Sequence, residues 1–412
     1  MPLFNFTAFR VFFPFAFGYF LSYLFRVVNA VIAPDLAADL DIGPSQLGLL
    51  TSTYFIAFAS SQLPLGIFLD RFGPRIVESF LLLFAVLGAY IFSTSQTLTG
   101  VIIGRAFIGF GVSACLMAAF KSYVLFFPEK AWPRVNGFQM AAGGLGALCA
   151  TTPVEWMLKL TDWRGLFAVL AVISLGAALG IFLIVPEKKT SPSRESFSSQ
   201  IDGIRKIFKS PHFLRIAPLV TLSQAGFLSL QGLWSGPWLR DRAGMSRPEI
   251  ADVLFWTAFA TICGYIFFGL MAEALSKKGF SVISTAVTGM TLFIGIQALI
   301  TFNTGFPASA LWILFGFFGT SGILSYSALS SHFPKTLSGR VTTSINLLVF
   351  IAAFILQWAI GAIIHLWGTG PAGNYHPSGY LAGFLMVSCL QVAGLCWFWC
   401  SGKILPNQKP PC

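Results

Sequence analysis

Long apolar runs separated by short polar or Gly/Pro-rich breaks make up most of the chain. Continuous runs, rather than a polar residue at every second position, favour membrane-spanning helices over β-strands. A spanning helix needs about 20 residues, and the breaks divide the chain into about twelve runs near that length. These runs cover residues 8–33, 45–68, 76–96, 99–127, 134–158, 163–185, 213–238, 249–272, 280–301, 307–331, 340–366 and 380–400. We therefore expect an all-α polytopic membrane protein with twelve transmembrane helices.

The composition agrees with this expectation. Of the 412 residues, 56% are hydrophobic and only 10% are charged, whereas about 25% of the residues of a soluble domain are charged. The net charge is +11, but the basic residues follow the loops, so the expected partner is the lipid bilayer and not nucleic acid. The seven cysteines form neither a CxxC pair nor a Cys/His cluster, so we expect no metal and no other cofactor.

The distribution of Lys and Arg predicts the topology. One set of connections holds 18 of the 26 basic residues, and the alternate set holds 5. By the positive-inside rule we expect both termini to lie in the cytoplasm. We expect the protein itself to lie in the plasma (bacterial inner) membrane. The expected organisation is a six-helix bundle over 1–186, a cytoplasmic linker over 187–212 and a second bundle over 213–412. The linker is expected to carry a short amphipathic helix, with an apolar side formed by Ile201, Ile204, Ile207 and Phe208.

Two cytoplasmic patterns recur half a chain apart. GIFLDRFGPR at 66–75 and GLMAEALSKK at 269–278 share a glycine, an acid four residues later and a base nine residues later, at an offset of 203. The FP and RV pairs within 127–135 recur within 333–341, at an offset of 206. Two matches at nearly the same offset predict a duplicated six-helix unit, an arrangement typical of transporters.

The loop at 66–75 resembles the signature loop of the major facilitator superfamily, G-x-x-x-D-R-x-G-R-R/K. The matching residues are Gly66, Asp70, Arg71, Gly73 and Arg75. The segment GRAFIGFG at 104–111 also resembles the fourth-helix motif of this superfamily. The resemblance covers the whole chain and implies two six-helix bundles, secondary transport by rocker-switch alternating access, and no enzymatic activity.

The resemblance also implies a conformational latch at this loop. Gly66 would allow close helix approach, and Asp70 would accept hydrogen bonds from the N-terminus of the eleventh helix, where a carboxylate is favoured. That terminus lies near 338–340, and the contact would hold the outward-open state. Glu273 is the corresponding acid in the second copy.

Three basic residues lie inside the apolar runs, and such charges mark functional sites because each costs at least about 2.5 kcal/mol at the bilayer centre. The first is Arg26, which shares a helical face with Tyr19, Ser22, Tyr23 and Asn29 at spacings of 3, 4, 3 and 3. We expect this polar stripe to bind substrate. The alternative is that Arg26 extends toward the membrane surface or forms a structural pair.

The sequence around Arg26 resembles the first helix of the anion:cation symporter branch, which reads Y-x-D-R with a proline eight residues after the arginine. Tyr23, Arg26 and Pro34 match, but Phe25 replaces the acid. In that branch and in sugar-phosphate exchangers, this arginine contacts the anionic group of the substrate. Because the missing acid serves proton coupling, the resemblance favours an anion site more than proton symport.

Arg105 and Lys121 lie in the fourth run. Arg105 is expected either to contribute to the substrate site or to form helix–helix hydrogen bonds. Lys121, 16 residues later, would point about 160° away from Arg105 on an ideal helix. We therefore rank it as a secondary candidate for the positive charge of the site. All fifteen acids and all four histidines lie in loops or near segment ends, which predicts that a buried proton relay is absent.

The second half offers neutral candidates for substrate binding. Gln224, Gln231 and Trp234 share a face of the seventh run, and Asn346 and Gln357 share a face of the eleventh. The alternative for each is an interhelical hydrogen bond, worth about 0.6 kcal/mol in a membrane protein.

The sequence thus predicts a monomeric secondary transporter for a small organic anion, with the coupling ion and the direction left open. The main alternative is an exporter of neutral or cationic amphiphiles. A transporter-like sensor would carry a sizeable soluble extension, and a membrane enzyme would need clustered catalytic groups. The sequence shows neither feature.

Overall fold

The computed structural model describes residues 6–128, 132–187, 197–333, 337–368 and 374–404. By its internal contacts the chain divides into two compact units, Met1–Ser193 and Arg194–Cys412, and each unit is described by itself. The division falls inside the linker expected from the sequence, although residues 188–196 of that linker lie outside the described ranges.

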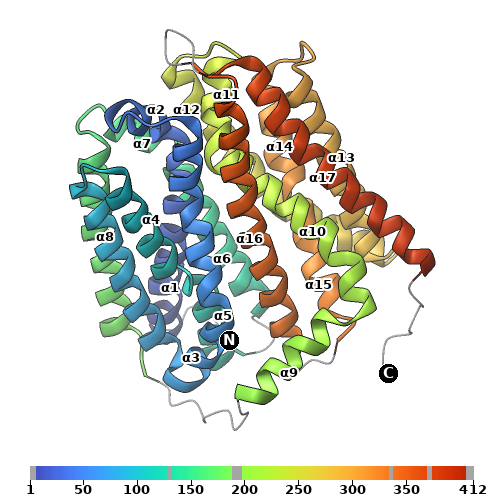
Figure 1. Cartoon of the computed structure of the whole chain (residues 1–412). Coiled ribbons are helices and arrows are strands. Elements are labelled where there is room, and N and C mark those ends of the chain that lie inside the picture. The colour runs from blue at the N-terminus through green and yellow to red at the C-terminus, as the bar shows by residue number, and fades with distance from the viewer. Residues whose placement is uncertain (1–5, 129–131, 188–196, 334–336, 369–373, 405–412) are drawn as a thin grey trace. The chain divides into compact units, whose positions relative to one another are not determined.

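The first unit is built of eight helices over its described residues (Figure 1). They are α1 (Phe6–Val27), α2 (Asn29–Asp39), α3 (Pro44–Thr94), α4 (Leu98–Gly111), α5 (Cys115–Phe126), α6 (Trp132–Cys149), α7 (Thr152–Met157) and α8 (Trp163–Ile184).

The second unit is also helical throughout its regular elements. They are α9 (Phe197–Phe208), α10 (Pro211–Ser229), a π-helical turn (Leu230–Trp234), α11 (Ser235–Asp241), α12 (Arg247–Ser276), α13 (Val282–Phe302), α14 (Ala308–Gly319), a 3₁₀ turn (Thr320–Ile323), α15 (Leu324–Ser330), α16 (Ser338–His365) and α17 (Pro377–Ile404).

The helices confirm an all-helical membrane protein. Within the described residues, nine helical stretches are long and apolar enough to cross a bilayer, and α1 with α2 adds a tenth if the bent pair counts as one span. The expected runs 45–68 and 134–158 correspond to the first part of α3 and to α6 with α7, which are not among these ten.

Several runs that the sequence presents as continuous are broken helices. The first run bends by 47° between α1 and α2, and the fourth is interrupted at 112–114, between α4 and α5. The second unit repeats both features. Its first spanning helix contains the π turn at 230–234, and its fourth contains the 3₁₀ turn at 320–323. Such interruptions often occur at functional sites in helices.

Matched glycine contacts reveal the duplication in three dimensions. A Cβ added at Gly109 of α4 would lie 2.3 Å from the carbonyl oxygen of Tyr54 on α3, and one at Gly316 of α14 would lie 2.4 Å from that of Thr257 on α12. The two positions are offset by 316 − 109 = 207 and 257 − 54 = 203 residues. These offsets match those of the cytoplasmic patterns, so the same close helix pair occurs in both units.

In the signature loop, Gly73 rather than Gly66 has the structural requirement for glycine. Gly73 has φ 78° and ψ 159° and interrupts α3, and this positive φ is costly for residues with a Cβ. A Cβ added at Gly66 would meet no atom within 4 Å, and the close helix approach expected there stays a prediction.

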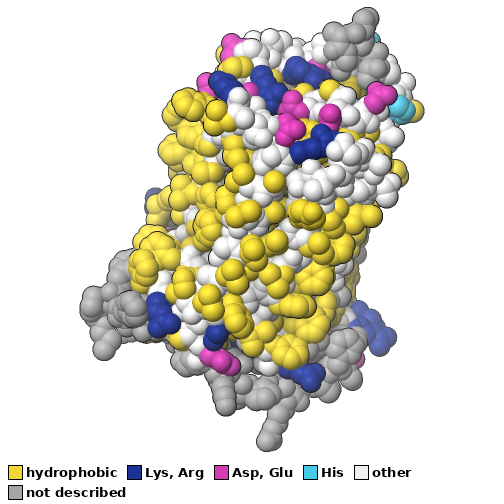
Figure 2. Space-filling view, turned by 90° about the vertical axis from the view of Figure 1, so that its left-hand side faces the viewer, with side chains coloured by type: hydrophobic (Ala, Val, Ile, Leu, Met, Phe, Trp, Pro, Cys, Tyr) yellow, Lys and Arg dark blue, Asp and Glu magenta, His cyan; other side chains and the backbone are white. Residues whose placement is uncertain are grey.

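The face of the first unit that carries α8 is apolar. Val172 and Leu183 on this helix are 71% and 69% exposed. Figure 2 shows hydrophobic side chains over the middle of this side of the molecule, and charged side chains gathered toward its two ends. A broad apolar band of this kind suits contact with lipid.

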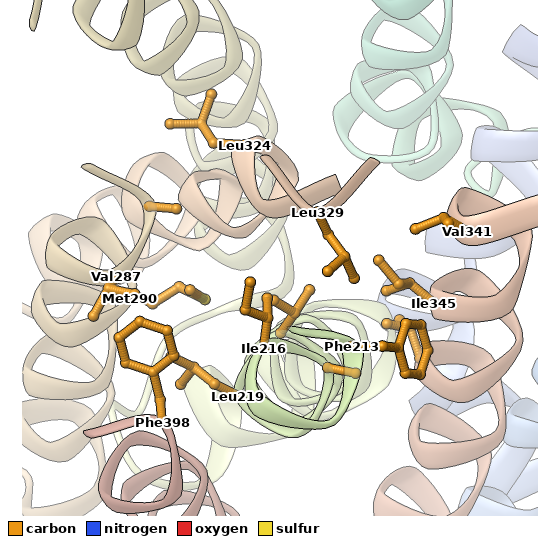
Figure 3. Packing of buried hydrophobic residues seen from close by; sticks show 14 of the residues in the cluster. Phe213, Ile216, Leu219, Val287, Met290, Leu324, Leu329, Val341, Ile345 and Phe398 are labelled. Atoms are coloured by element: carbon orange, nitrogen blue, oxygen red, sulfur yellow. The ribbon is translucent and has the colours of Figure 1, made fainter. Parts of the chain in front are cut away.

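The core of the second unit packs around α10. Phe213, Ile216 and Leu219 of α10 contact Met290 of α13, Ile345 of α16 and their buried neighbours (Figure 3). Helix α9 joins the same cluster through the fully buried Ile207. Its charged residues Arg205 and Lys206 are exposed, so the helix is amphipathic and rests on the second unit. The side chain of Ile201 lies outside the described residues.

Candidate substrate-binding site

Arg26 lies at the bend between α1 and α2. It is the penultimate residue of α1, and Val28 separates α1 from α2, which begins at Asn29. The sequence placed Arg26 and Asn29 on one straight helix, and the 47° bend places them in two helical segments instead. Arg26 is 8% exposed, so its guanidinium is held almost entirely inside the protein.

Aromatic rings surround the Arg26 guanidinium. Its Cζ lies 4.5 Å from the ring centroid of Tyr23, 5.6 Å from that of Phe58 and 6.0 Å from that of Tyr54. Tyr23 is on α1, whereas the other two rings come from α3. A cation within about 6 Å of a ring centroid is attracted by the negative ring face, by about 2 kcal/mol or more when it is desolvated.

Arg105 of α4 joins the same cluster. It is 1% exposed, its Nη1 donates a hydrogen bond to the carbonyl oxygen of Phe25 at 2.7 Å, and its Cζ lies 4.8 Å from the Tyr54 ring centroid. Both roles considered for this residue are therefore compatible with its position. It ties α4 to α1, and it adds a second guanidinium to the ring that Arg26 approaches.

Tyr54 is the residue that the sequence interpretation missed. Its hydroxyl donates to the carbonyl oxygen of Ser22 at 3.1 Å, and its backbone packs against Gly109, so the ring is fixed from both ends. The side chain is completely buried. Among 53 Tyr and Phe residues (9 + 44), no sequence signal separates this ring from ordinary core residues.

Asn29 and Tyr19 lie on either side of Arg26 along the chain. Asn29 is completely buried, and neither atom of its amide has a hydrogen-bond partner within the described residues. Leaving such a group unpaired costs about 1–3 kcal/mol, so the position favours a polar ligand or water. The Tyr19 hydroxyl donates to Sδ of Met140 on α6 at 3.6 Å, and its ring is 5.1 Å from that of Tyr23.

Lys121 is half-buried on α5, whereas Arg105 is on α4. The sequence argument separated the two by rotation along one ideal helix. That argument does not apply, because the break at 112–114 divides them.

In the second unit the candidate side chains connect helices. Nε2 of Gln224 donates to the carbonyl oxygen of Gly319 at 2.9 Å, and the Trp234 indole donates to that of Gln357 at 3.1 Å. Nε2 of Gln231 lies 3.5 Å from Oγ1 of Thr261. These contacts are the interhelical hydrogen bonds considered as the alternative role. Asn346 is half-buried on α16.

The basic and acidic residues around the signature loop have partners within their own units. Nε of Arg75 donates to the carbonyl oxygen of Phe182 at 2.8 Å and thereby caps the end of α8. Glu273 pairs with Lys277 at 2.7 Å, and Arg71 lies over the Phe72 ring at 5.3 Å. The side chain of Asp70 lies outside the described residues, so the latch stays a prediction.

Three acids that the sequence places near segment ends are buried by tertiary packing. One is Glu155 of α7, which is 6% exposed. Glu78, in the second part of α3, is completely buried. The side chain of Asp241, at the end of α11, is also completely buried. All three residues are near segment ends in sequence, as expected, but tertiary packing encloses them.

Asp241 is fully provided with partners. Its carboxylate forms a bidentate pair with Arg240 at 2.6 and 3.1 Å. It also accepts hydrogen bonds from the Tyr380 hydroxyl at 2.7 Å and from the backbone N–H of Tyr375 at 3.1 Å. This carboxylate therefore joins the end of α11 to the start of α17 and has a structural role.

The broken first helix, the close α3–α4 pair and the duplicated units agree with a comparison to known families. Residues 15–355 match the Major Facilitator Superfamily. The chain belongs to this superfamily. Superfamily members are transporters and not enzymes, which confirms the prediction of a membrane transporter and of a non-enzymatic function.

Three relatives of this chain carry names that point to different kinds of substrate. The cis,cis-muconate transport protein of Acinetobacter baylyi is 25% identical over 321 residues, which cover 74% of this chain and 75% of the relative. A probable sulfoacetate transporter of Cupriavidus necator is 22% identical and covers 69% of each chain. The multidrug resistance protein MdtM of Escherichia coli O157:H7 is 24% identical, covering 90% of this chain and 88% of its own.

A solved superfamily structure confirms the fold over the full chain. The crystal structure of a D-xylose-proton symporter superimposes with a TM-score of 0.75 at 15% identity, covering 98% of this chain and 99% of the symporter. At this identity the similarity shows the fold alone.

Proposed function

We propose that this transporter moves a small organic anion and binds its anionic group at Arg26. The observation that carries the proposal is the pair of buried guanidinium groups, Arg26 and Arg105, on the ring of Tyr54 beside the bend in α1. A bend that exposes backbone groups beside buried charge is typical of substrate sites in transporters.

The charge of this cluster favours an anion. The Arg26 charge interacts with the phenol rings of Tyr54, Tyr23 and Tyr19, among other groups. The Arg105 charge interacts with Tyr54 and with Arg26 itself. Two neighbouring guanidinium groups repel each other, and a bound carboxylate or sulfonate would relieve that repulsion. Guanidinium also matches such groups geometrically through paired hydrogen bonds.

Two of the relatives support the same substrate class. Muconate is a dicarboxylate, and sulfoacetate carries one carboxylate and one sulfonate, so both are small organic dianions. We assign the remaining expected ligand contacts to Tyr19, Tyr23 and Asn29 in the first unit. In the second unit, Gln224, Gln231, Trp234, Asn346 and Gln357 stay predicted ligand contacts.

The family mechanism completes the proposal. The two units would rock between inward-open and outward-open states in the plasma membrane, with both termini in the cytoplasm, as a monomer. The acidic and basic residues of the signature loop, together with Glu273, would hold one of these states. The Lys/Arg distribution and the loop motif support these assignments.

A thermal-shift screen of the purified protein tests the substrate class. We expect muconate and sulfoacetate to raise the unfolding temperature of the wild type and of Lys159→Ala, an exposed-charge control. Neither anion should stabilise Arg26→Ala. Labelled muconate should likewise enter proteoliposomes that contain the wild type or Lys159→Ala, but not those that contain Arg26→Ala. An unchanged anion response in Arg26→Ala would refute the site.

The match to MdtM over 90% of this chain favours multidrug export as the second candidate. The same screen separates the two, because an exporter of this kind would be stabilised by neutral or cationic amphiphiles. Stabilisation by tetraphenylphosphonium, with no response to any anion, would replace the anion proposal by the export function.

A further inference from the structure

Glu78 is a carboxyl group enclosed by the packing of the first unit. It lies five residues after the break at Gly73 in α3 and is completely buried. A Cβ added at Gly18 of α1 would lie 2.3 Å from its Oε1 and 3.6 Å from a methyl group of Ile181 on α8. Since Gly18 has no side chain, the backbone of α1 leaves just enough room for the acid.

The surroundings of Glu78 provide little for a negative charge. Neither carboxyl oxygen has an N–H or O–H donor within the described residues, and the only hydrogen bond there comes from the thiol of Cys115. The adjacent titratable groups are the Cys115 thiol, a weak donor, and the Tyr123 phenol, both on α5. Tyr123 donates its hydroxyl hydrogen to Oε1 of Gln139 at 2.6 Å, and the contacts from α1 and α8 are apolar.

An ionised carboxylate would therefore be poorly compensated here, because burying a charge without a partner costs several kcal/mol. The structure accommodates Glu78 as a neutral acid. A group that is neutral in this packing, and that becomes charged only when the packing opens, changes its proton occupancy with conformation. Apart from the weak contact with the Cys115 thiol, no ion pair or hydrogen bond in the described residues gives this acid another role.

Glu78 is also placed to sense the occupancy of the anion site. The Cys115 thiol, at the start of α5 just after the 112–114 break, interacts electrostatically with both Glu78 and Arg26. Gly18, which covers the acid, and Arg26 are both on α1, eight residues apart. Their separation is about 12 Å at 1.5 Å per residue.

The sign of the coupling follows from the charges. Arg26 attracts an ionised Glu78, and a bound anion cancels that attraction and adds repulsion. An anion at Arg26 therefore favours the protonated acid. For two charges separated by about as much as Gly18 and Arg26 along α1, about 12 Å, and an effective dielectric constant of about 20, one charge pair changes the equilibrium about tenfold. By linkage, protonation of Glu78 strengthens anion binding by the same factor.

We propose that Glu78 is a proton-binding site coupled to the anion site, so that the protein carries a proton together with its organic anion. This inference rests on the proposed function, because it takes Arg26 as the anion site. The proposal names the coupling ion, which the sequence left open. It assigns the ion to a residue that the sequence placed near a segment end.

Transport in proteoliposomes tests the coupling with muconate as the probe. In the wild type an inward proton gradient should drive accumulation of muconate above the level reached without a gradient. Glu78→Gln, which mimics the neutral acid, should lose that accumulation but retain counterflow of labelled against unlabelled muconate. Glu155→Gln, which alters another buried glutamate of the first unit, should behave as the wild type. Gradient-driven accumulation by Glu78→Gln at the wild-type level would overturn the proposal.

A binding measurement on the wild type keeps the test independent of the variant. In a weakly buffered detergent solution with a pH indicator, at an alkaline pH where Glu78 is partly ionised, muconate binding should take up protons, at most about half a proton per anion for a tenfold coupling. Binding without proton uptake would overturn the proposal while leaving the anion site intact. An absence of muconate counterflow in the wild type would instead remove this substrate from the proposed function.

Infrared spectroscopy then decides the proton site itself, whatever the substrate. On a jump to alkaline pH, the wild type should lose the carbonyl band of a protonated acid without hydrogen bonds. Glu155→Gln should show this band, and Glu78→Gln should not. The same band in Glu78→Gln, or no such band in the wild type, would overturn the proposal.

Discussion

The close pairing of α3 and α4 predicts a large effect from one methyl group at Gly109. In Gly109→Ala the added Cβ would lie 2.3 Å from the carbonyl oxygen of Tyr54 and 2.9 Å from its Cα and carbonyl carbon. All three atoms belong to the backbone of a packed helix, so no side-chain rotation can relieve the overlap. The two helices must move apart.

The size of the effect follows from this geometry. Ordinary contact at a Cβ begins at 3.4 Å, so the helices must separate by about 1 Å along this line. Inserting a carbon into a well-packed interior costs about 1–3 kcal/mol. The separation also moves Tyr54 away from Arg105, which is one helical turn from Gly109. We therefore expect weaker muconate binding as well as lower stability.

Two matched variants make the measurement specific. Gly176→Ala in α8 adds the same methyl group at an exposed position with no atom within 4 Å, where alanine favours a helix by about 1 kcal/mol. Gly316→Ala creates the equivalent overlap with Thr257 in the second unit. Thermal unfolding followed by tryptophan fluorescence should rank Gly109→Ala and Gly316→Ala below the wild type, and Gly176→Ala at or above it. Equal stability of Gly109→Ala and Gly176→Ala would refute the close packing.

Three further predictions concern the second unit. Asp241→Asn leaves Arg240 without its bidentate partner, so it should lower the free energy of unfolding by about 1–3 kcal/mol. The control Asp202→Asn, on the exposed side of α9, should have little effect in the same thermal assay. Trp234→Phe removes the hydrogen bond to the Gln357 carbonyl and should lower the free energy of unfolding by at least about 1 kcal/mol. Trp256→Phe, at a 53% exposed site, should be nearly neutral. Equal unfolding temperatures of the two variants would contradict this prediction. Burial raises the pKa of Tyr375 from 10.0 to about 12, against the lowering effect of Arg240. The unfolded state then loses its proton first, so the wild type should lose stability relative to Tyr375→Phe as the pH rises from 10 to 12, and parallel pH profiles would contradict the assignment.

Much of the candidate site could be anticipated because charge is rare inside an apolar run. Arg26 and Arg105 were identifiable from sequence alone, since an arginine between apolar residues has few structural explanations in a membrane helix. Tyr54 and Phe58 could not be identified in this way. Their role depends on which ring lies beside the guanidinium, and the chain contains many similar rings.

The burial of Glu78 could not be predicted from the sequence. Its sequence position, just after the charged signature loop, correctly indicates the end of a segment. Whether an acid at such a position meets water or protein depends on the neighbouring helices. Here Gly18 of α1 allows the backbone to cover the carboxyl group, and residues 60 positions apart cannot reveal that contact through a local pattern.

The sequence by itself determined the helical membrane architecture, the duplication and the superfamily, because hydrophobic run length and loop motifs are local properties. Only the tertiary structure decided where the helices break, which rings contact the arginines and which acids are buried. These features arise from contacts between helices distant in sequence, whose energies depend on packing at distances of a few ångströms.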